Sequence, residues 1–453
     1  ANVHNVGSGR PAFTPYVIRN VDLGFHRPVK VGILGLTTPG SAIWDKAHVE
    51  GHLEFAGVVE QARLWVPVVR RDGADIVIVL SHSGMDLSSS YGDALPFPEN
   101  ISERLATVVP GIDLVLCGHT HLDIPQRVVR NKRTGEPVLM TQPMRWGMRL
   151  SIADLEIECT GNEFQVISRQ ARTLNTNAVD ADRRITGRLR RSHGKVVGYV
   201  NSRIGTAREA MSATTSRYAD SAAIDFINYV QASAVKVEIA GSPEEGLPVL
   251  SIAAPFNRDA AIPAGDVSVR DVAGLYLYDN TLLAITLTGA QVKEYLERSA
   301  EYFTAVDGTG PFPPGDVTNA PTERAPGGTP DYNYDIMAGL DAPLSYDIDL
   351  AEEPGSRIVG LAYDGRPLDD SGTYVIAINN YRQAGGGGFP HVVDAPVAYN
   401  AQVEVRQLII DWVSEQGEID PTVFASDDWR LTYDGDPIEI STEHDRDTVA
   451  VTV

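Results

Sequence analysis

Three short apolar segments in the first third of the chain constrain its fold most strongly. They are Val29–Leu36 (VKVGILGL), Asp75–Leu80 (DIVIVL) and Asp113–Cys117 (DLVLC). Continuous apolar runs of this length are typical of strands that are buried on both faces. A helical stretch, Phe55–Arg71, separates the first two segments, although Pro67 is unfavourable within it. Strands alternating with helices in this way predict an α/β sandwich with a covered sheet.

The chain has 453 residues, more than one hydrophobic core usually organises, so we expect two domains. A basic, polar stretch between Asp180 and Gly205 predicts an exposed linking helix followed by the start of a new strand. We therefore place a first domain at residues 1–175, a helical linker at 176–202 and a second domain at 203–453. The boundaries rest on this change of composition.

The second domain is predicted to open with a helix from Tyr218 to Ala232. Later segments, Leu282–Leu287 and Thr373–Ile378, are typical of strands. A stretch rich in proline and glycine, Val306–Pro330, predicts a long loop. Together these features predict an α+β second domain.

The overall composition excludes several classes of protein. The formal net charge of −22 opposes binding to nucleic-acid polymers, although solubility alone is the ordinary explanation for such a charge. No apolar run of eighteen residues occurs, so no membrane span is expected. The two cysteines, Cys117 and Cys159, cannot form a disulfide framework, and the sequence does not decide whether they pair.

Histidines follow two of the predicted strands at the point where each strand ends. His119 and His121 lie two residues apart directly after DLVLC, and His82 follows DIVIVL. Neutral imidazole is the commonest transition-metal ligand, and the ends of strands in α/β folds carry the chemistry. A single histidine is more often a surface or core residue. Three histidines at equivalent strand ends instead favour a metal site.

Competing catalytic patterns are absent from the sequence. It contains no G-x-S-x-G, no Walker A lysine, no H-E-x-x-H and no C-x-x-C. The run Gly385–Gly388 has no lysine after it, so it is not a phosphate-binding loop of that type and indicates a flexible turn beside a pocket. Covalent catalysis through a serine or a cysteine is therefore not expected.

Two motifs carry a resemblance to a known family. Ser81-His82-Ser83-Gly84 and Gly118-His119-Thr120-His121 resemble the last two metal-ligand blocks of the calcineurin-like metallophosphoesterases. Asn380-Tyr381-Arg382, which leads into Gly385–Gly388 and Phe389, resembles the C-terminal domain of the 5′-nucleotidase family. Within that family, further blocks resemble the 2′,3′-cyclic-nucleotide 2′-phosphodiesterase/3′-nucleotidase branch: Pro15–Ile18, Ile43–Ala47, Ala254–Phe256, Tyr276–Leu282 and Asp331–Asp335.

The resemblance implies two divalent metal ions, Zn, Mn or similar, with His82 and His119 on one metal and His121 on the other. In the family, three other ligand blocks, Asp-x-His, Gly-Asp and Gly-Asn-His, lie upstream of the segment equivalent to Ala1, so this sequence is expected to lack them. The fold is therefore expected to be a partial metallophosphoesterase sandwich joined to a 5′-nucleotidase-type domain. A missing N-terminal segment of the same protein is expected to carry the catalytic residues upstream of Ala1. By resemblance, the protein is periplasmic, cell-wall associated or secreted.

The resemblance also implies that Tyr278 and Tyr381 sandwich a nucleotide base, with rings roughly 7 Å apart, twice the usual stacking distance. Tyr334 and Phe389 are lower-ranked members of the same pocket. Alternatively, Tyr278 is a strand residue that faces the core, and Tyr381 is an ordinary turn residue. The small nucleotide is the expected partner.

Three functions therefore compete. Hydrolysis of 2′,3′-cyclic nucleotides and 3′-nucleotides is favoured by the branch-like blocks. Hydrolysis of 5′-nucleotides or nucleotide sugars is the second hypothesis, and a nucleotide-binding fragment without catalysis is the third.

Overall fold

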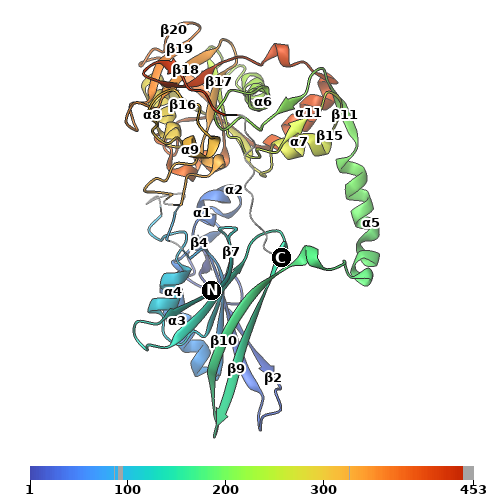
Figure 1. Cartoon of the computed structure of the whole chain (residues 1–453), viewed down its shortest axis with the longest axis vertical. Helices are drawn as coiled ribbons and strands as arrows, with labels where there is room; N and C mark the ends of the chain where they lie inside the picture. Colours follow the sequence, from blue (N-terminus) through green and yellow to red (C-terminus); the bar gives the residue numbers. More distant parts are fainter. Residues whose placement is uncertain (86, 90–94, 326, 442–453) are drawn as a thin grey trace. The chain divides into compact units, whose positions relative to one another are not determined.

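The chain divides into two compact units, residues 1–187 and 188–453. The structure is a computed structural model that describes residues 1–85, 87–89, 95–325 and 327–441 (Figure 1). Each unit has a hydrophobic core of its own.

A six-stranded sheet forms the centre of the first unit. Its spatial order is β2 (Tyr16–Val21), β3 (Val29–Thr37), β5 (Ile76–His82), β6 (Leu114–Cys117), β8 (Pro137–Pro143) and β7 (Asp123–Arg130). The four inner strands are parallel, and the two edge strands are antiparallel to their neighbours. The three strands predicted from the apolar segments are confirmed. β5 continues two residues beyond the predicted end, so His82 is the last residue of a strand.

Two helices, α3 (Val58–Arg71) and α4 (Ser102–Val108), cover one face of this sheet (Figure 1). Leu34, Val77 and Val115 belong to the core on this face and are completely buried. Pro67 is exposed, so its ring faces away from the core. The predicted helical start at Phe55 is wrong, because Phe55 ends a short strand, β4 (Leu53–Phe55), that pairs with β1 (Val3–Asn5).

The opposite face of the sheet is covered in part by a long hairpin, β9 (Arg149–Thr160) and β10 (Glu163–Asn175). Val29, Ile76 and Phe164 form a small core between the hairpin and the sheet. Near the carboxyl ends of the strands this face stays open, and Leu80 is 44% exposed there. The smaller helices of this unit are α1 (Ser41–Trp44), α2 (Lys46–Val49) and η1 (Thr176–Ala178).

The second unit is built on two five-stranded sheets. The first contains β17 (Ile336–Gly339), β13 (Val249–Ala253), β21 (Thr373–Asn379), β16 (Thr281–Thr288) and β22 (Val397–Glu404). The second contains β20 (Arg366–Pro367), β19 (Ile358–Tyr363), β18 (Leu344–Asp349), β24 (Trp429–Tyr433) and β25 (Asp436–Pro437). Smaller sheets join β15 (Gly265–Ser268), β11 (Arg203–Ala207) and β23 (Glu418–Ile419), and β12 (Met211–Ser212) and β14 (Ala261–Ile262). The predicted strands at Leu282–Leu287 and Thr373–Ile378 are confirmed.

The helices of this unit are α6 (Ala222–Glu238), α7 (Val269–Leu275), α8 (Gly289–Ala300), α9 (Pro314–Val317), α10 (Asn380–Gln383), α11 (Val405–Gln416), η2 (Asp331–Asn333), η3 (Gly386–Gly388) and η4 (Pro421–Val423). α6 begins after Ser221 and runs to Glu238, so the helix predicted from Tyr218 to Ala232 lies too early. The predicted loop Val306–Pro330 contains the short helix α9.

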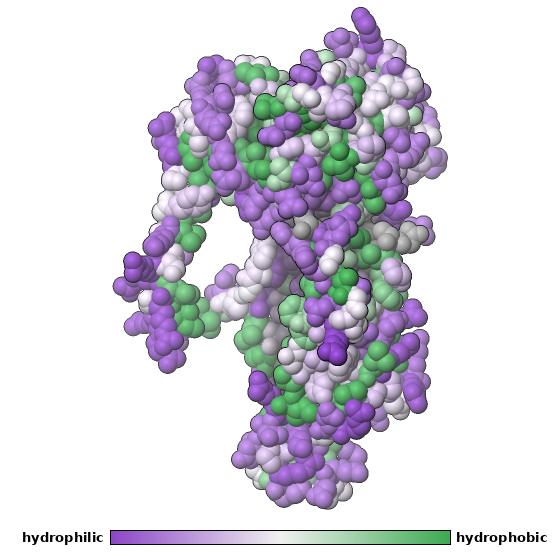
Figure 2. Space-filling view, turned by 180° about the vertical axis from the view of Figure 1, so that it is seen from behind, coloured by the Kyte–Doolittle hydropathy of each residue, from purple (hydrophilic) through white to green (hydrophobic). Residues whose placement is uncertain are grey.

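One helix, α5 (Arg183–Val200), has no buried residue. Its apolar side chains Ile185, Leu189 and Val196 are each more than half exposed. Figure 2 shows hydrophobic and hydrophilic side chains on the surface of this segment, at the left edge of the view. Among the residues that the structure describes, no helix combines the length and the apolar character that a bilayer crossing requires.

Candidate active site

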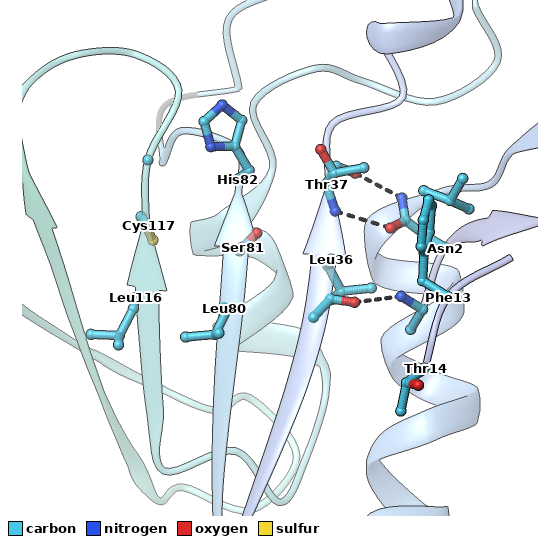
Figure 3. A pocket seen from close by; sticks show the side chains of 14 residues that line it. Asn2, Phe13, Thr14, Leu36, Thr37, Leu80, Ser81, His82, Leu116 and Cys117 are labelled. Carbon is cyan, nitrogen blue, oxygen red and sulfur yellow. Dashed lines mark hydrogen bonds between the residues drawn. The ribbon is translucent and has the colours of Figure 1, made fainter. Parts of the chain in front are cut away.

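His82 lies at the carboxyl end of β5, an inner strand of the sheet. Its backbone pairs with Thr37, the last residue of β3, and its ring extends beyond the strand (Figure 3). His82 lines a cavity of about 510 Å³ together with the strand ends Leu36, Thr37 and Cys117. Asn2 closes one side by accepting a hydrogen bond from the Thr37 amide at 2.9 Å and donating to the Thr37 carbonyl at 2.7 Å.

His119 lies next to His82, on the loop that follows β6. The two ring centroids are 5.4 Å apart and the ring planes are inclined at 62°. Trp44, at the end of α1, stacks on His119 with centroids 5.1 Å apart. Nε2 of His119 lies 2.6 Å from Oε1 of Glu99, a largely buried carboxylate. Groups from three further segments therefore fix the orientation of this imidazole.

The glycines of the two histidine motifs allow the loops to approach each other. A Cβ on Gly118 would lie 3.3 Å from Nδ1 of His82, and a Cβ on Gly84 would lie 2.3 Å from the Thr120 methyl group. Gln142 holds the second loop by donating to Thr120 Oγ1 at 2.8 Å and to the Leu122 carbonyl at 3.0 Å. A larger residue at either glycine would push the histidines apart.

His121 belongs to the same region but has a different environment. Its ring centroid lies 6.2 Å from that of Trp146. Both His119 and His121 have positive φ values, 79° and 59°, which are uncommon for residues other than glycine. This backbone conformation is a local strain at the motif, of the kind that clusters at functional sites.

Burial lowers the pKa of His82, and the neighbouring His119 and His121 lower it further. Burial also lowers the pKa of His121, with smaller effects from Arg145 and His119. The three histidines are therefore close enough to influence one another electrostatically. His82 and His121 favour neutral imidazole, the form that coordinates a metal ion.

These residues do not complete a metal centre by themselves. Within the described part of the chain, no group of three or more histidine, cysteine, aspartate or glutamate residues is placed to hold a metal ion. The rings of His82 and His119 are in edge-to-face contact, whereas the ring of His121 packs beside Trp146. The three imidazoles are suitable donors for Zn or Mn, but a two-metal site needs bridging carboxylates in addition.

Sequence reasoning did not select Glu99 or Trp44 as site residues. Trp44 entered only as part of a block that resembles the family, and nothing in its local sequence indicates a stack on His119. Glu99 follows a proline-rich stretch, and its contact with His119 spans 20 residues of sequence. Only the sheet topology brings these side chains to the histidines.

The second unit places Tyr278 and Tyr381 beside one 3₁₀ turn, η2. Tyr278 is 41% exposed, and its ring centroid lies 6.1 Å from that of Tyr332. The Tyr381 hydroxyl donates to Oδ1 of Asn333 at 3.2 Å. The two tyrosines come from distant parts of the sequence and contact adjacent residues of the same turn.

Asn380 links the segments that carry these two tyrosines. Its side-chain oxygen accepts a hydrogen bond from the Thr281 amide at 3.0 Å. Arg382 supports the turn η2, because it donates to the Tyr332 carbonyl at 2.5 Å and to Asn333 Oδ1 at 3.0 Å. Asp335 pairs with Arg382 through both of its oxygens, at 2.6 and 2.9 Å. Burial would lower the pKa of Arg382, but this buried carboxylate raises it.

The other two residues expected in this pocket have buried rings. Tyr334 is 1% exposed and stacks on Tyr302 in the core, with centroids 4.6 Å apart. Phe389 is 4% exposed, and its ring contacts Tyr295 and the guanidinium of Arg382, each at 4.4 Å. In this arrangement neither ring has a free face for a base. Both rings are packed in the core of the second unit, and their place in a base-binding pocket stays a prediction.

Comparison with known proteins agrees with this architecture. Residues 24–123 match the calcineurin-like phosphoesterase family, and residues 197–394 match the 5′-nucleotidase C-terminal domain. The chain is 30% identical over 473 residues to the 2′,3′-cyclic-nucleotide 2′-phosphodiesterase/3′-nucleotidase of Salmonella typhimurium, with 95% of this chain and 70% of that protein covered. The structure of a putative 5′-nucleotidase from Staphylococcus aureus matches 95% of this chain and 77% of its own, with a TM-score of 0.71 and 25% identity.

A first unit of calcineurin-like phosphoesterase type and a second unit of 5′-nucleotidase type thus define the class of protein. The chain belongs to the 5′-nucleotidase family of calcineurin-like metallophosphoesterases, enzymes that hydrolyse nucleotide phosphoesters. It is also 31% identical to the trifunctional nucleotide phosphoesterase YfkN of Bacillus subtilis, but it spans only 30% of that protein's length.

Proposed function

We propose that this chain belongs to a metal-dependent hydrolase of 2′,3′-cyclic nucleotides and 3′-nucleotides. The observation that carries the proposal is the pair of imidazoles, His82 and His119, that two adjacent strand ends of the phosphoesterase unit bring together. Relatives from three bacteria that carry the corresponding name support the substrate class.

Each site residue has a role in this proposal. His82, His119 and His121 are metal donors. Two divalent ions are expected, in a site that combines these imidazoles with bridging carboxylate ligands. Glu99 fixes the ring of His119, as the outer partners of metal-binding histidines commonly do. Tyr278 and Tyr381 stack on the base. A location outside the cytoplasm, periplasmic or cell-wall associated, is also part of the proposal and rests on the family resemblance.

Hydrolysis of 5′-nucleotides is the second candidate. The similarity in fold to the putative 5′-nucleotidase of Staphylococcus aureus supports it. Binding of nucleotides without catalysis is the third candidate, because the described residues do not hold a complete metal-ligand set.

Two measurements separate these candidates. The first is metal analysis and turnover of the purified 453-residue chain, for which we expect weak binding of a divalent cation and negligible hydrolysis. Robust hydrolysis by a verified chain of this length, without a co-purifying fragment, would show that its own donors suffice for the reaction.

The second measurement uses the protein as its own cell produces it, with Mn²⁺ or Zn²⁺ and a panel of 2′,3′-cyclic AMP, 3′-AMP, 5′-AMP and a nucleotide sugar. We expect the cyclic nucleotide and 3′-AMP to be preferred, and His82→Ala or His119→Ala to reduce kcat by about 100-fold or more. His193→Ala, on the exposed helix α5, is the matched control and should be silent. A preference for 5′-AMP would select the second candidate, and nucleotide binding without any turnover would select the third.

A further inference from the structure

A second cavity lies within the second unit. Its volume is about 260 Å³, and its walls come from α6, from the connection between β17 and β18, and from residues 423–428. Asp225, Asn228 and Asp428 line it together with apolar and aromatic groups. None of the tyrosines assigned to the nucleotide base lines this cavity.

Two buried side-chain oxygens in its wall receive no hydrogen bond from an amide or hydroxyl group of the described residues. They are Oδ1 of Asp225, which is 3% exposed and whose carboxyl hydrogen-bonds the carboxyl of Asp220, and Oδ1 of Asn228, which is 1% exposed. An unpaired buried polar atom typically costs about 1–3 kcal/mol, so such atoms usually have a partner. Asn228 Oδ1 is an acceptor, and Asp225 Oδ1 is an acceptor when the carboxyl is ionised, so the missing partner is a hydrogen-bond donor.

The part of the cavity wall that contains Asp225 and Asp428 is negatively charged. Asp220 lies beside Asp225, and its Oδ2 accepts the Asp428 amide at 2.6 Å. Burial, together with the neighbouring Asp220 and Asp428, raises the pKa of Asp225 to about 9, and burial is also the main cause that raises the pKa of Asp428 to about 6. Within the described residues, no lysine or arginine forms an ion pair with any of these three carboxylates. The donor that fits is therefore a cation.

Other charged and titratable groups near these three carboxylates do not neutralise their negative charge. Asp341 lines the cavity and pairs with Lys236 at 2.9 Å, both of them partly exposed. Burial raises the pKa of Tyr346, on β18, and the same three carboxylates raise it further. These groups add no free positive charge to the cavity.

Size and lining distinguish an organic cation from a metal ion. A volume of about 260 Å³ corresponds to roughly nine water molecules, which is much more than one metal ion fills. No group of three carboxylate or imidazole residues placed to hold a metal ion occurs among the residues described. Ala232, Leu340 and Pro343 give the cavity apolar walls, and the rings of Tyr229 and Phe424 lie 5.6 Å apart beside them.

We propose that this cavity is a binding site for a small primary alkylammonium compound. Its ammonium group donates hydrogen bonds to Asp225, Asn228 and Asp428, and its alkyl part lies against the apolar walls. An ammonium group has three donors and no acceptor, which matches a wall that carries the carboxylates of Asp225 and Asp428 and the amide oxygen of Asn228. Aromatic rings beside the site add cation–π attraction.

The test is titration of the full chain with n-butylamine by calorimetry, with 1-butanol as the neutral analogue. We expect saturable binding of the amine and none of the alcohol. Asp225→Asn and Asn228→Ala should each weaken the amine at least tenfold. Asp347→Asn, which removes the same charge from an exposed ion pair with Arg430, is the matched control and should change the affinity less than twofold.

The wild-type chain provides a second readout that requires no substitution. Alkylammonium stays protonated up to about pH 10, whereas the carboxylates of the cavity lose protons between pH 6 and 9. The affinity for butylamine should therefore rise with pH over this interval. The proposal is overturned if no saturable binding occurs, if the alcohol binds as well as the amine, if the affinity is flat with pH, or if Mg²⁺ or Ca²⁺ displaces the amine by occupying the same carboxylates.

Discussion

Tyr278 and Tyr381 are anchored by different neighbours. The ring of Tyr278 packs against Phe256 and Tyr332. The hydroxyl of Tyr381 donates to Asn333, and its ring lies 5.2 Å from the guanidinium of Arg382. Loss of the Tyr381 hydroxyl should therefore have a measurable effect.

If the two rings hold a base, replacing either of them by alanine should weaken nucleoside binding by about 1–3 kcal/mol for every base, because stacking tolerates base identity. Tyr381→Phe should cost about 0.5–1.5 kcal/mol, the usual net value of a hydrogen bond. Calorimetric titration of adenosine and uridine into the full chain measures all three variants. Unchanged affinity in either alanine variant would return that tyrosine to a purely structural role.

Asp225 makes a separate prediction about stability. Its pKa is about 9 in the folded chain, against an ordinary value of 3.8, so the folded state holds a proton that the unfolded state has lost. Folding stability therefore falls as the pH rises from about 4 toward 9. Asp225→Asn removes this penalty and should stabilise the second unit by about 1 kcal/mol or more at pH 8, and by little at pH 4.

Urea unfolding at several pH values measures this difference. Asp347→Asn again serves as the control, because its exposed ion pair is expected to contribute less than about 1 kcal/mol at any pH. A constant difference between Asp225→Asn and wild type from pH 4 to 8 would contradict the assignment of a buried proton to this site.

At the scale of elements, the glycine turn η3 is held by arginines. Arg382, Arg298 and Arg324 donate to the carbonyls of Gly386, Gly387 and Gly388 at 3.2, 2.9 and 2.7 Å. Gly387 has φ of 79°, and a Cβ there would lie 2.6 Å from Nη1 of Arg382 and 3.0 Å from Oδ1 of Asn333. Glycine is required at this position both by its φ value and by the close packing.

Gly387→Ala should therefore destabilise the second unit by about 3 kcal/mol, from backbone strain plus overpacking against the Arg382 pair. Gly241→Ala is a matched control, because Gly241 has the same φ of 79° but no neighbouring atom within 4 Å of the position that a Cβ would take. It should cost about 1–2 kcal/mol, from strain alone. Equal losses in the two variants, measured by urea unfolding, would show that the packing around the turn is not tight.

Particular elements show which features of the fold and of the site could be predicted from the sequence. The buried strands β3, β5 and β6 were predictable because continuous apolar runs have few alternatives. The histidines at the carboxyl ends of β5 and β6 were predictable with the strands. Glu99 and Trp44 were not, because their contacts with His119 depend on long-range topology. The burial of Tyr334 and Phe389 was not predictable, because a motif match names a residue but not how much of its ring the core covers.

At the scale of the molecule, each unit carries its own core, so each should unfold as a unit. Calorimetry or urea unfolding should resolve two transitions. Leu34→Ala, in the core of the first unit, should lower one transition by about 2–5 kcal/mol, and Leu250→Ala, in the core of the second, should lower the other. A single transition shifted by both variants would show that the two cores unfold together.

The exposed helix α5 also determines how the chain responds to proteases. It contains six arginine and lysine residues and no buried side chain, so little tertiary packing opposes its local opening. Brief digestion with trypsin should cut there first and leave two fragments that resist further cleavage, readily resolved by mass spectrometry. In a cell that secretes proteases, this segment would be the first to be cleaved, and each surviving half would keep its own fold.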